Sequence, residues 1–434
     1  MTEALFLGAI LLLPFQFALN LAENVDLVTT KVLVPIVFCA WLIRGLSKKR
    51  IRLPSKMETW LIAVFLGLSG ISLVLGRDWE LGIRKTLYFL SVFPIFFISA
   101  DLLENRSFRM KAVGAIIASG SLAALTGIVQ FSLPFILGLD GTLKIWRSLA
   151  YFFLGNSFGK VIAINPSWLV NISGNTWMRA FGFFPDPHNF SFFVSLCFFV
   201  AIGYLFSGKN VAYRLAAGAG AGLMLLAIAL SFSRGSYLGI LAGIIFFTAF
   251  FLGRSGYLGK ASVVLALFVA LLFLIYPKPI SQRLVSVFNL KEGSNKERMK
   301  NWEEAFGIIL DHPLAGVGLG GYATTVDPAA EDRSSIYAHN IFLDIAAETG
   351  ILNSLVFLIL ILTCAWRGIT SKNFFGLGIA SGGIYFLVHG IFDTPLWSPQ
   401  VMVIFLVVVA MGMYSNKLKA QGVKLFAESG AVFD

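Results

Sequence analysis

The stretch NFSFFVSLCFFVAIGYLF, residues 189–206, decides the fold class, because it is largely apolar and contains no charged side chain. A helix needs about 20 residues of this kind to cross a bilayer. Similar stretches recur along the chain, so the sequence predicts an all-α, polytopic membrane protein with about twelve transmembrane helices. The other expected spans are residues 4–20, 27–43, 59–76, 86–103, 111–133, 212–231, 235–252, 259–276, 341–364, 374–390 and 397–414.

The composition of the 434 residues agrees with this prediction. Apolar residues make up 57% and charged residues only 13%, against about 25% charged residues in a soluble domain. These values exclude a soluble globular enzyme and a disordered chain. The net charge of +11 is typical of cytoplasmic loops beside membrane lipids and does not indicate a nucleic-acid partner. Cys39, Cys197 and Cys364 lie inside apolar runs, which predicts neither a disulfide nor a zinc site.

Lysine and arginine are concentrated in every second loop between the expected spans. The positive-inside rule places these loops and both termini in the cytoplasm, so residues 1–434 are expected to form one multi-pass membrane domain. Two long segments, 134–188 and 277–340, then lie outside, and segments of this length are usually functional. All four histidines fall on that outer side, which indicates proton chemistry there unless their placement is chance. The histidines are His188, His312, His339 and His389, and the basic loop residues include Arg44, Lys48, Lys49, Arg106, Arg109, Lys111, Lys209, Arg214, Arg254, Lys260, Arg367 and Lys372.

The second outer segment is expected to be partly helical. Ser294 and Glu297 form a capping-box pattern, which predicts a helix running to about Leu310. On that helix Arg298 and Trp302 share a face with the apolar residues that follow, so Arg298 lies on the packed side. Arg298 therefore either pairs with a neighbour or snorkels beside Trp302, or it directs its guanidinium at an anionic substrate.

Residues 311–322, DHPLAGVGLGGY, contain a glycine spacing that resembles a nucleotide-binding loop. We reject that interpretation, because no strand precedes the glycines and the segment lies on the outer side. The pattern instead predicts the end of the preceding helix and a tight, closely packed turn.

His339 directly precedes the expected span 341–364, which places it near a helix N-terminus at the outer face. The positive end of the helix dipole disfavours imidazolium there, and a neutral imidazole is the form that a general base needs. Asn340, Asp344 and Glu348 follow at intervals of four and form a polar stripe on the same helix. Acidic residues inside a membrane usually face the bundle interior and serve function. The alternative is that His339 is an ordinary interfacial side chain.

Further polar residues gather at the outer ends of other spans. Arg179 and Arg234 lie beside apolar spans, where an arginine is costly unless it snorkels or is paired. His389 and Asp393 end the span 374–390. Arginines bind phosphate oxygens bidentately, so this rim suits a lipid-linked pyrophosphate. The outer side shows no D-x-D pair that would hold Mg²⁺, so arginines can take the place of a metal.

These residues resemble the O-antigen ligase/polymerase superfamily of bacterial membrane glycosyltransferases. The twelve-span layout with a large outer segment before the tenth span is also similar. The motifs are Arg298 with Trp302, the run 312–320 (HPLAGVGLG), residues 338–343 (AHNIFL), residues 348–350 (ETG), residues 179–185 (RAFGFFP), residues 233–235 (SRG), and His389 with Asp393.

The resemblance implies an inverting, metal-independent transfer of a glycan from undecaprenyl pyrophosphate to a lipid or glycan acceptor hydroxyl. It implies a location in the bacterial inner membrane, with the active site facing the periplasm, and no cofactor. It makes His339 the base and Arg298, Arg179 and Arg234 the pyrophosphate ligands. Possible supporting residues are His389, Asp393, Asp344, Glu348 and Tyr337.

The type of reaction stays open at this point. The long 134–188 segment is more typical of chain-extending polymerases than of a simple ligase, so both interpretations remain. A twelve-span transporter or lipid-linked-glycan flippase is the rival class, and it predicts two related six-span halves. No such repeat is visible in the sequence. A purely structural membrane subunit would leave the outer arginines and histidines without a purpose.

Overall fold

The computed structural model describes residues 1–22, 25–49, 51, 53–54, 56–76, 78–156, 159, 166–172, 174–252, 281–283, 293–330 and 336–415. Within these residues the chain is almost entirely helical, with two small antiparallel hairpins. This confirms the prediction of an all-α, polytopic membrane protein. The predicted span 259–276 lies outside the described residues.

Eight helices in the described part of the chain are long and apolar enough to cross a membrane. They include one continuous span made of α4 (Trp79–Val92) and α5 (Pro94–Leu102). Three shorter apolar helices accompany them, α1 (Thr2–Leu12), α18 (Phe374–Gly390) and α19 (Pro399–Gly412). The remaining long helices are α2 (Thr29–Ser47), α3 (Met57–Leu75), α6 (Arg106–Ser132), α9 (Pro187–Ser207), α10 (Val211–Leu230), α11 (Arg234–Leu252) and α17 (Ile351–Thr370).

The first predicted span, 4–20, is wrong in its second half. Helix α1 ends at Leu12, and Ala18–Ala22 forms strand β1, which pairs with β2 (Val25–Val28). Pro14 lies two residues after the end of α1, and proline lacks the N–H that a continuing helix requires. An apolar run alone does not distinguish a helix from a strand.

The predicted span 341–364 is also corrected, because it is divided at Gly350 into α16 (Ile341–Thr349) and α17. Gly350 has φ +91°, and a Cβ atom at this position would lie 2.0 Å from the carbonyl oxygen of Leu314. The glycine-rich loop packs into the break, where Val317 N–H donates to the Ala347 carbonyl at 2.8 Å. Asp344 and Glu348 therefore lie on a short helix at the end of the bundle and not within a span. The predicted tight, closely packed turn is confirmed, since Gly316, Gly318 and Gly320 all have positive φ.

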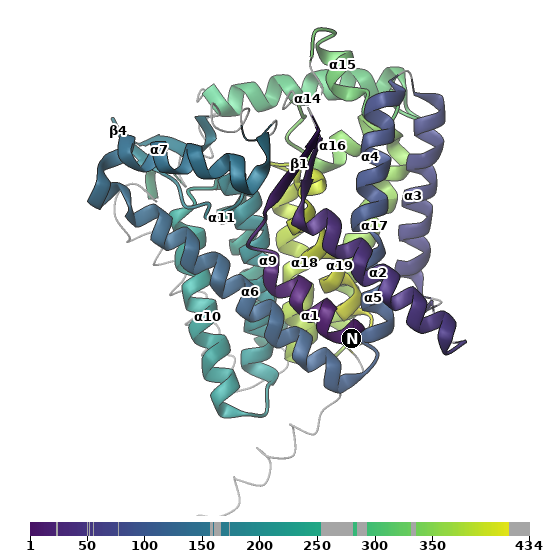
Figure 1. Cartoon of the computed structure of the whole chain (residues 1–434), viewed down its shortest axis with the longest axis vertical. Coiled ribbons are helices and arrows are strands. Elements are labelled where there is room, and N and C mark those ends of the chain that lie inside the picture. The colour runs from purple at the N-terminus through teal and green to yellow at the C-terminus, as the bar shows by residue number, and fades with distance from the viewer. Residues whose placement is uncertain are drawn as a thin grey trace, which may run out of the picture.

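The centre of the bundle consists of α9, α18 and α19 (Figure 1). Their side chains are buried along almost their whole length. Helices α9 and α18 approach closely at Gly203 and Gly378, where a Cβ on Gly203 would lie 3.1 Å from the Gly378 Cα. Helices α10, α11 and α6 flank this core on one side, and α17, α3 and α4 flank it on the other. Small residues at such contacts are typical of helix packing in membranes.

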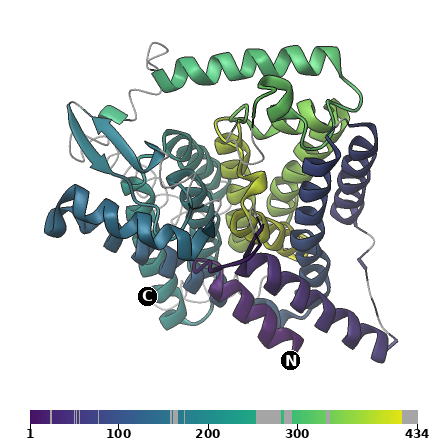
Figure 2. The ribbon, with the colours of Figure 1, turned by 45° about the horizontal axis from the view of Figure 1, so that its top comes forward.

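The two predicted outer segments carry the remaining elements. Residues 134–188 contain α7 (Pro134–Leu154), the 3₁₀ turn η1 (Pro166–Trp168) and strands β3 (Leu169–Ile172) and β4 (Asn175–Met178). The second segment contains α14 (Gly293–Asp311), which confirms the predicted helix, and α15 (Tyr322–Val326). Helix α14 lies across one end of the bundle (Figure 2). Its predicted packed face is confirmed, because Ala305 and Ile309 are buried in a cluster that includes residues of α16.

Candidate active site

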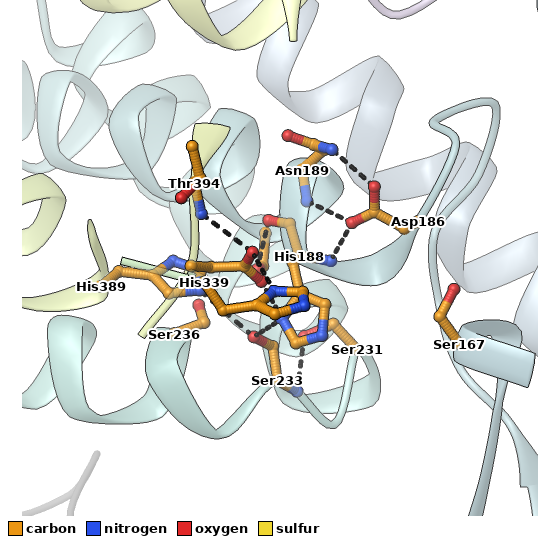
Figure 3. A network of polar contacts seen from close by, with 12 residues as sticks. Ser167, Asp186, His188, Asn189, Ser231, Ser233, Ser236, His339, His389 and Thr394 are labelled. Atoms are coloured by element: carbon orange, nitrogen blue, oxygen red, sulfur yellow. Dashed lines mark hydrogen bonds and ion pairs between the residues drawn. The ribbon is translucent and has the colours of Figure 1, made fainter. Parts of the chain in front are cut away.

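A cluster of histidine, aspartate and serine side chains lies at the end of the bundle covered by α14. His188 is at the start of α9, whose N-terminus is capped by Asp186. Ser233 precedes α11, and His339 is two residues before α16. His389 lies in the last turn of α18, with Asp393 shortly after it. Figure 3 shows His188, Ser233, His339 and His389 reaching one place from these separate elements. The structure thus brings together three of the four histidines, whereas His312 is exposed at the end of α14.

Asp393 is the centre of this cluster. Its Oδ1 lies 3.4 Å from His339 Nδ1, and its Oδ2 lies 3.0 Å from His188 Nδ1. The backbone N–H of Thr394 donates to Oδ1 at 2.9 Å. Burial alone would raise the pKa of Asp393, but the histidines and Arg298 outweigh burial and hold its pKa well below the ordinary value. Asp393 is therefore a carboxylate that orients two imidazoles.

His339 sits in a strained position with its outer nitrogen accessible. Its φ is +52°, in the left-handed region, which costs about 1–3 kcal/mol for a non-glycine residue. Its side chain is 38% exposed. With Nδ1–H directed at Asp393, the Nε2 atom of a neutral ring carries the lone pair that a base needs.

The expected lowering of the His339 pKa by the helix dipole is outweighed by a neighbouring carboxylate. Burial lowers the pKa of His339, but its hydrogen bond to Asp393 and the negative charge of that residue leave the pKa above the ordinary value. Helix α16 is only nine residues long, and Asn340 caps its first N–H groups. A carboxylate at 3.4 Å therefore outweighs the end of a short, capped helix.

Asp344 braces the two segments that carry His339 and Asp393. It is buried, and its Oδ1 accepts a hydrogen bond of 2.8 Å from the Ala338 N–H, next to His339. Its Oδ2 accepts a hydrogen bond from the hydroxyl of Thr394, next to Asp393. Burial raises the pKa of Asp344 to about 6. Asp344 thus fixes the spacing between the base and its carboxylate without contacting either.

The other two supporting candidates near His339 have different contacts. Glu348 pairs with Lys85, whose ammonium also lies 4.2 Å from the centre of the Trp397 ring. This pair joins α16 to α4. The Tyr337 carbonyl accepts a hydrogen bond of 3.2 Å from Asn301 of α14, and burial raises the pKa of the Tyr337 hydroxyl. Glu348 and Tyr337 therefore hold α16 and the loop before it against their neighbours.

His389 is enclosed within the bundle. It is fully buried, its Nδ1 lies 2.8 Å from the Tyr385 hydroxyl and its Nε2 lies 3.4 Å from the Ser233 hydroxyl. Its ring also stacks on Phe192 at 3.6 Å. The Ser233 hydroxyl lies 3.1 Å from His188 Nδ1 as well. His389 thus supports the cluster from inside and offers no free ring nitrogen.

The three predicted arginines differ in their surroundings. Arg298 is partly buried, and within the described residues no hydrogen bond or ion pair involves it. Its charge acts on Asp393 and on both accessible histidines. Arg179 is 4% exposed and donates to the carbonyls of Ser231 (2.8 Å) and Ser167 (3.0 Å). Arg234 is the first residue of α11 and is buried next to Ser233.

Arg179 combines a structural contact with an unused donor. Its Nη2 atom is buried and has no hydrogen-bond partner among the described residues. Burial and the charge of Arg283 lower the pKa of Arg179. The sequence analysis named His188 only as one of four outer histidines and Ser233 only within the motif 233–235, and it gave a role in the site to neither residue nor to Arg283. The position of His188 could have indicated a functional residue. It follows a proline at the outer end of a span, where contact with lipid would favour an apolar side chain.

The same cluster contains a group with the composition of a metal site. The donor atoms of His188, His389 and Asp393 lie within 4.8 Å of one another. Two observations oppose a bound cation here. The donor atoms already contact each other or Ser233, and the charges of Arg179 and Arg298 act on both histidines. Positive charges in a buried site repel a divalent ion strongly.

One family model matches part of the chain. Residues 219–358 match the family model of the O-antigen ligases. The matched segment contains Arg234, Arg298, His339 and Asp344, whereas Arg179, His188 and Asp393 lie outside it. No curated protein matches the chain. The match agrees with the predicted motifs and with the helical membrane fold, and it supports the resemblance to the O-antigen ligase/polymerase superfamily.

Proposed function

We propose that the chain transfers a glycan from undecaprenyl pyrophosphate to an acceptor hydroxyl at the outer face of the bacterial cytoplasmic membrane. The observation that carries this proposal is the pairing of His339 with Asp393 within reach of the Arg298 charge. A base held by a carboxylate suits the activation of a hydroxyl. Arg298 has no hydrogen-bond or ion-pair partner among the described residues, and such a cation suits an anionic leaving group.

In the proposed reaction His339 Nε2 removes the proton from the acceptor hydroxyl. The acceptor oxygen then attacks the anomeric carbon of the glycan from the side opposite the pyrophosphate, and the bond from that carbon to the phosphate oxygen breaks. One displacement of this kind inverts the anomeric configuration. Asp393 stabilises the imidazolium that forms on His339, because its carboxylate lies 3.4 Å from Nδ1.

The arginines are proposed to bind the pyrophosphate. Negative charge grows on the phosphate oxygens as the bond breaks, and a guanidinium can meet two of these oxygens at once. Arg298 is best suited, since it is partly accessible, and Arg179 can contribute only through Nη2. Arg234 is the third candidate. In this mechanism the reaction needs no metal, so purified enzyme should stay active in EDTA. Loss of activity that Mg²⁺ restores would contradict the metal-free mechanism but not the transfer reaction itself.

The proposed orientation is supported by the loops opposite the cluster. Arg367 at the end of α17 pairs with Glu58 at the start of α3, and Lys56 and Arg109 lie near Tyr414, so these predicted cytoplasmic positions meet at one end of the bundle. The test is cysteine labelling in a background in which exposed Cys39 is changed to serine. Ser47→Cys should react only from the cytoplasm and Ala329→Cys only from outside. The reverse pattern would contradict an outer active site.

Ligase and polymerase remain alternatives within this proposal, and one experiment separates them. The gene is deleted, and lipid-linked and acceptor-linked glycans are compared by mass spectrometry. Loss of acceptor-linked glycan with intact donor indicates a ligase, whereas loss of chain length indicates a polymerase. Accumulation of donor on the cytoplasmic side would instead indicate a flippase and would contradict the transfer reaction.

A further inference from the structure

Two histidines are bound to one carboxylate in the same manner. His188 and His339 both direct Nδ1 at Asp393, at 3.0 Å and 3.4 Å, each using a different carboxylate oxygen. Neither Nε2 atom is hydrogen-bonded to a described residue, and both side chains are partly exposed, at 22% and 38%. The site therefore presents two oriented imidazoles with their outer nitrogens available to a substrate.

His188 differs in this respect from His389, its other imidazole neighbour. Both nitrogens of His389 are occupied by hydroxyl groups of the bundle, and the ring is fully buried. His188 is accessible because it lies in the first turn of α9, outside the packed core. Of these two histidines, only His188 can touch a substrate in this arrangement.

The electrostatic surroundings of His188 favour an anionic ligand. Asp393 interacts with it as a negative charge, and Arg179 and Arg298 interact with it as positive charges. Asp186, which accepts a hydrogen bond of 2.8 Å from the His188 backbone N–H, adds a second carboxylate. Both arginines would attract a pyrophosphate bound beside the ring. Burial outweighs Asp393 and, together with the two arginines, holds the pKa of His188 well below its ordinary value in the free protein. A bound pyrophosphate would raise that pKa, and the protonated ring would then place an Nε2–H donor beside the phosphate oxygens.

We infer that His188 is a second catalytic residue, which donates its Nε2 proton to the leaving phosphate oxygen while His339 accepts the proton of the acceptor hydroxyl. This inference rests on the proposed transfer reaction. The bond from the anomeric carbon to the phosphate oxygen breaks with its electron pair on oxygen, and that oxygen receives the His188 proton. The acceptor oxygen forms the new bond, and its proton moves to His339. The cluster ends with the same number of protons, carried on the other imidazole.

Sharing one carboxylate explains why two histidines can take opposite roles. Asp393 balances the charge of one imidazolium, whichever ring carries it, while two imidazoliums would leave the cluster with a net positive charge beside the arginines. Without donor, the proton is favoured on His339, whose pKa is raised. In the donor complex the pyrophosphate beside His188 favours the proton on that ring, so the active form has His188 protonated and His339 neutral. This predicts a bell-shaped dependence of kcat on pH, with the low-pH limb due to protonation of His339 and the high-pH limb due to loss of the His188 proton.

The test uses purified full-length protein with a defined lipid-pyrophosphate donor and acceptor. His188→Asn should lower kcat about tenfold to a hundredfold, toward the lower end of what a positioned acid contributes, with little change in donor affinity. It should also abolish the high-pH limb. A donor with a phosphorothioate at the leaving position, which needs less protonation, should restore more rate to the variant than to the wild type.

Controls separate this inference from folding and from the proposed function. His312→Asn makes the same change at an exposed histidine outside the cluster and should leave rate and pH profile unaltered. If His188→Asn melts at lower temperature than the wild type, His188→Gln provides a second variant, because its amide can still contact Asp393. His188→Gln should also lose the high-pH limb of the kcat profile. Wild-type protein that transfers nothing would refute the proposed function itself.

Two outcomes would overturn the inference while leaving transfer intact. One is a His188 variant with wild-type kcat and an unchanged pH profile, which would make His188 a packing residue. The other is wild-type activity abolished by EDTA and restored by Zn²⁺ or Mn²⁺, combined with loss of stoichiometric metal in the His188 variant. That result would make His188, His389 and Asp393 a metal site.

Discussion

The two ends of the helix bundle hold polar clusters of opposite character. At one end Glu58, 1% exposed, receives two hydrogen bonds from Arg367, at 2.8 Å and 3.3 Å. Nearby, Lys56 donates to the Met413 carbonyl at 2.6 Å. At the other end, Asp393 serves two histidines, while Arg298 has no hydrogen-bond or ion-pair partner among the described residues.

The difference shows which charges hold the fold and which are left for a ligand. A buried ion pair with matched partners ties helices together, and breaking it leaves an uncompensated charge. A cluster with excess cations and a left-handed residue such as His339 costs stability, which is typical of functional sites. We therefore expect substitutions at the His339 end to change rate, and substitutions at the Glu58 end to change stability.

The largest effect in this comparison is expected for Asp393→Asn. The amide cannot balance an imidazolium, so we expect a loss of about 10²–10⁴ in kcat, the range for a disabled acid–base unit. Asp393 raises the pKa of His339, and the base acts only when neutral. In the wild type, activity should therefore fall as the pH drops through this raised pKa. Removing the Asp393 carboxylate lowers the pKa of His339. The low-pH limb of any residual activity should therefore move to lower pH. An unmoved limb would mean that His339 does not titrate in it.

Arg298→Lys is expected to have the next effect. The charge is kept, but the planar fork is lost, and a charge-assisted hydrogen bond contributes about 1.5–3 kcal/mol. We expect roughly tenfold or more loss in kcat, at about 1.4 kcal/mol per decade, and a greater loss in Arg298→Ala. Steady-state kinetics with defined donor measure this. Full activity in the lysine variant would show that a guanidinium is not required.

Asp344 tests whether positioning alone matters. Asp344→Ala removes both hydrogen bonds, so His339 and Asp393 should lose their relative placement. A lost buried hydrogen bond costs about 1–3 kcal/mol, and about 1.4 kcal/mol corresponds to a tenfold change in rate. We therefore expect about a tenfold decrease in kcat. Asp344→Asn keeps an acceptor for the Ala338 N–H and should recover part of the rate. Because the negative charge of Asp344 raises the pKa of His339, the low-pH limb should move to lower pH. Equal loss in both variants would point to a direct role for the carboxylate.

The smallest effect on rate is expected at the opposite end of the bundle. Glu58→Gln removes the partner of Arg367, so the free energy of unfolding should fall by about 1–3 kcal/mol, less than for a fully buried pair because Arg367 is partly exposed. Thermal melting in detergent measures this loss. The kcat of folded protein should be unchanged, and a tenfold decrease would remove the distinction between the two ends.

Much of the fold could be predicted from the sequence, because apolar length and loop charge are strong signals in a membrane. The helix Gly293–Asp311 and the packed face of Ala305 followed from a capping pattern and periodicity. The hairpin after α1 and the break at Gly350 did not, because each depends on tertiary packing. The break is stabilised by a loop 30 to 40 residues earlier, whose Pro313 carbonyl accepts from the Ile351 N–H at 3.0 Å.

The site was predicted by residue type more successfully than by role. His339 and Arg298 could be singled out by their place beside a span and on a packed face. The convergence of His188, Ser233 and Asp393 was not visible, since it joins the ends of α9, α11 and α18, which lie far apart in the chain. The surroundings of Arg179 were equally hidden, because both of its acceptors are backbone carbonyls.

The most direct test of the central claim is single-turnover transfer by purified protein carrying His339→Ala, compared with wild type and with His312→Ala. Donor binding and thermal stability are measured on the same samples. The proposed mechanism predicts that His339→Ala binds the lipid-pyrophosphate donor normally but transfers about 10²–10⁴ times more slowly, while His312→Ala matches the wild type. Transfer at a near-normal rate by folded His339→Ala would contradict the assignment of the base and, with it, this account of the active site.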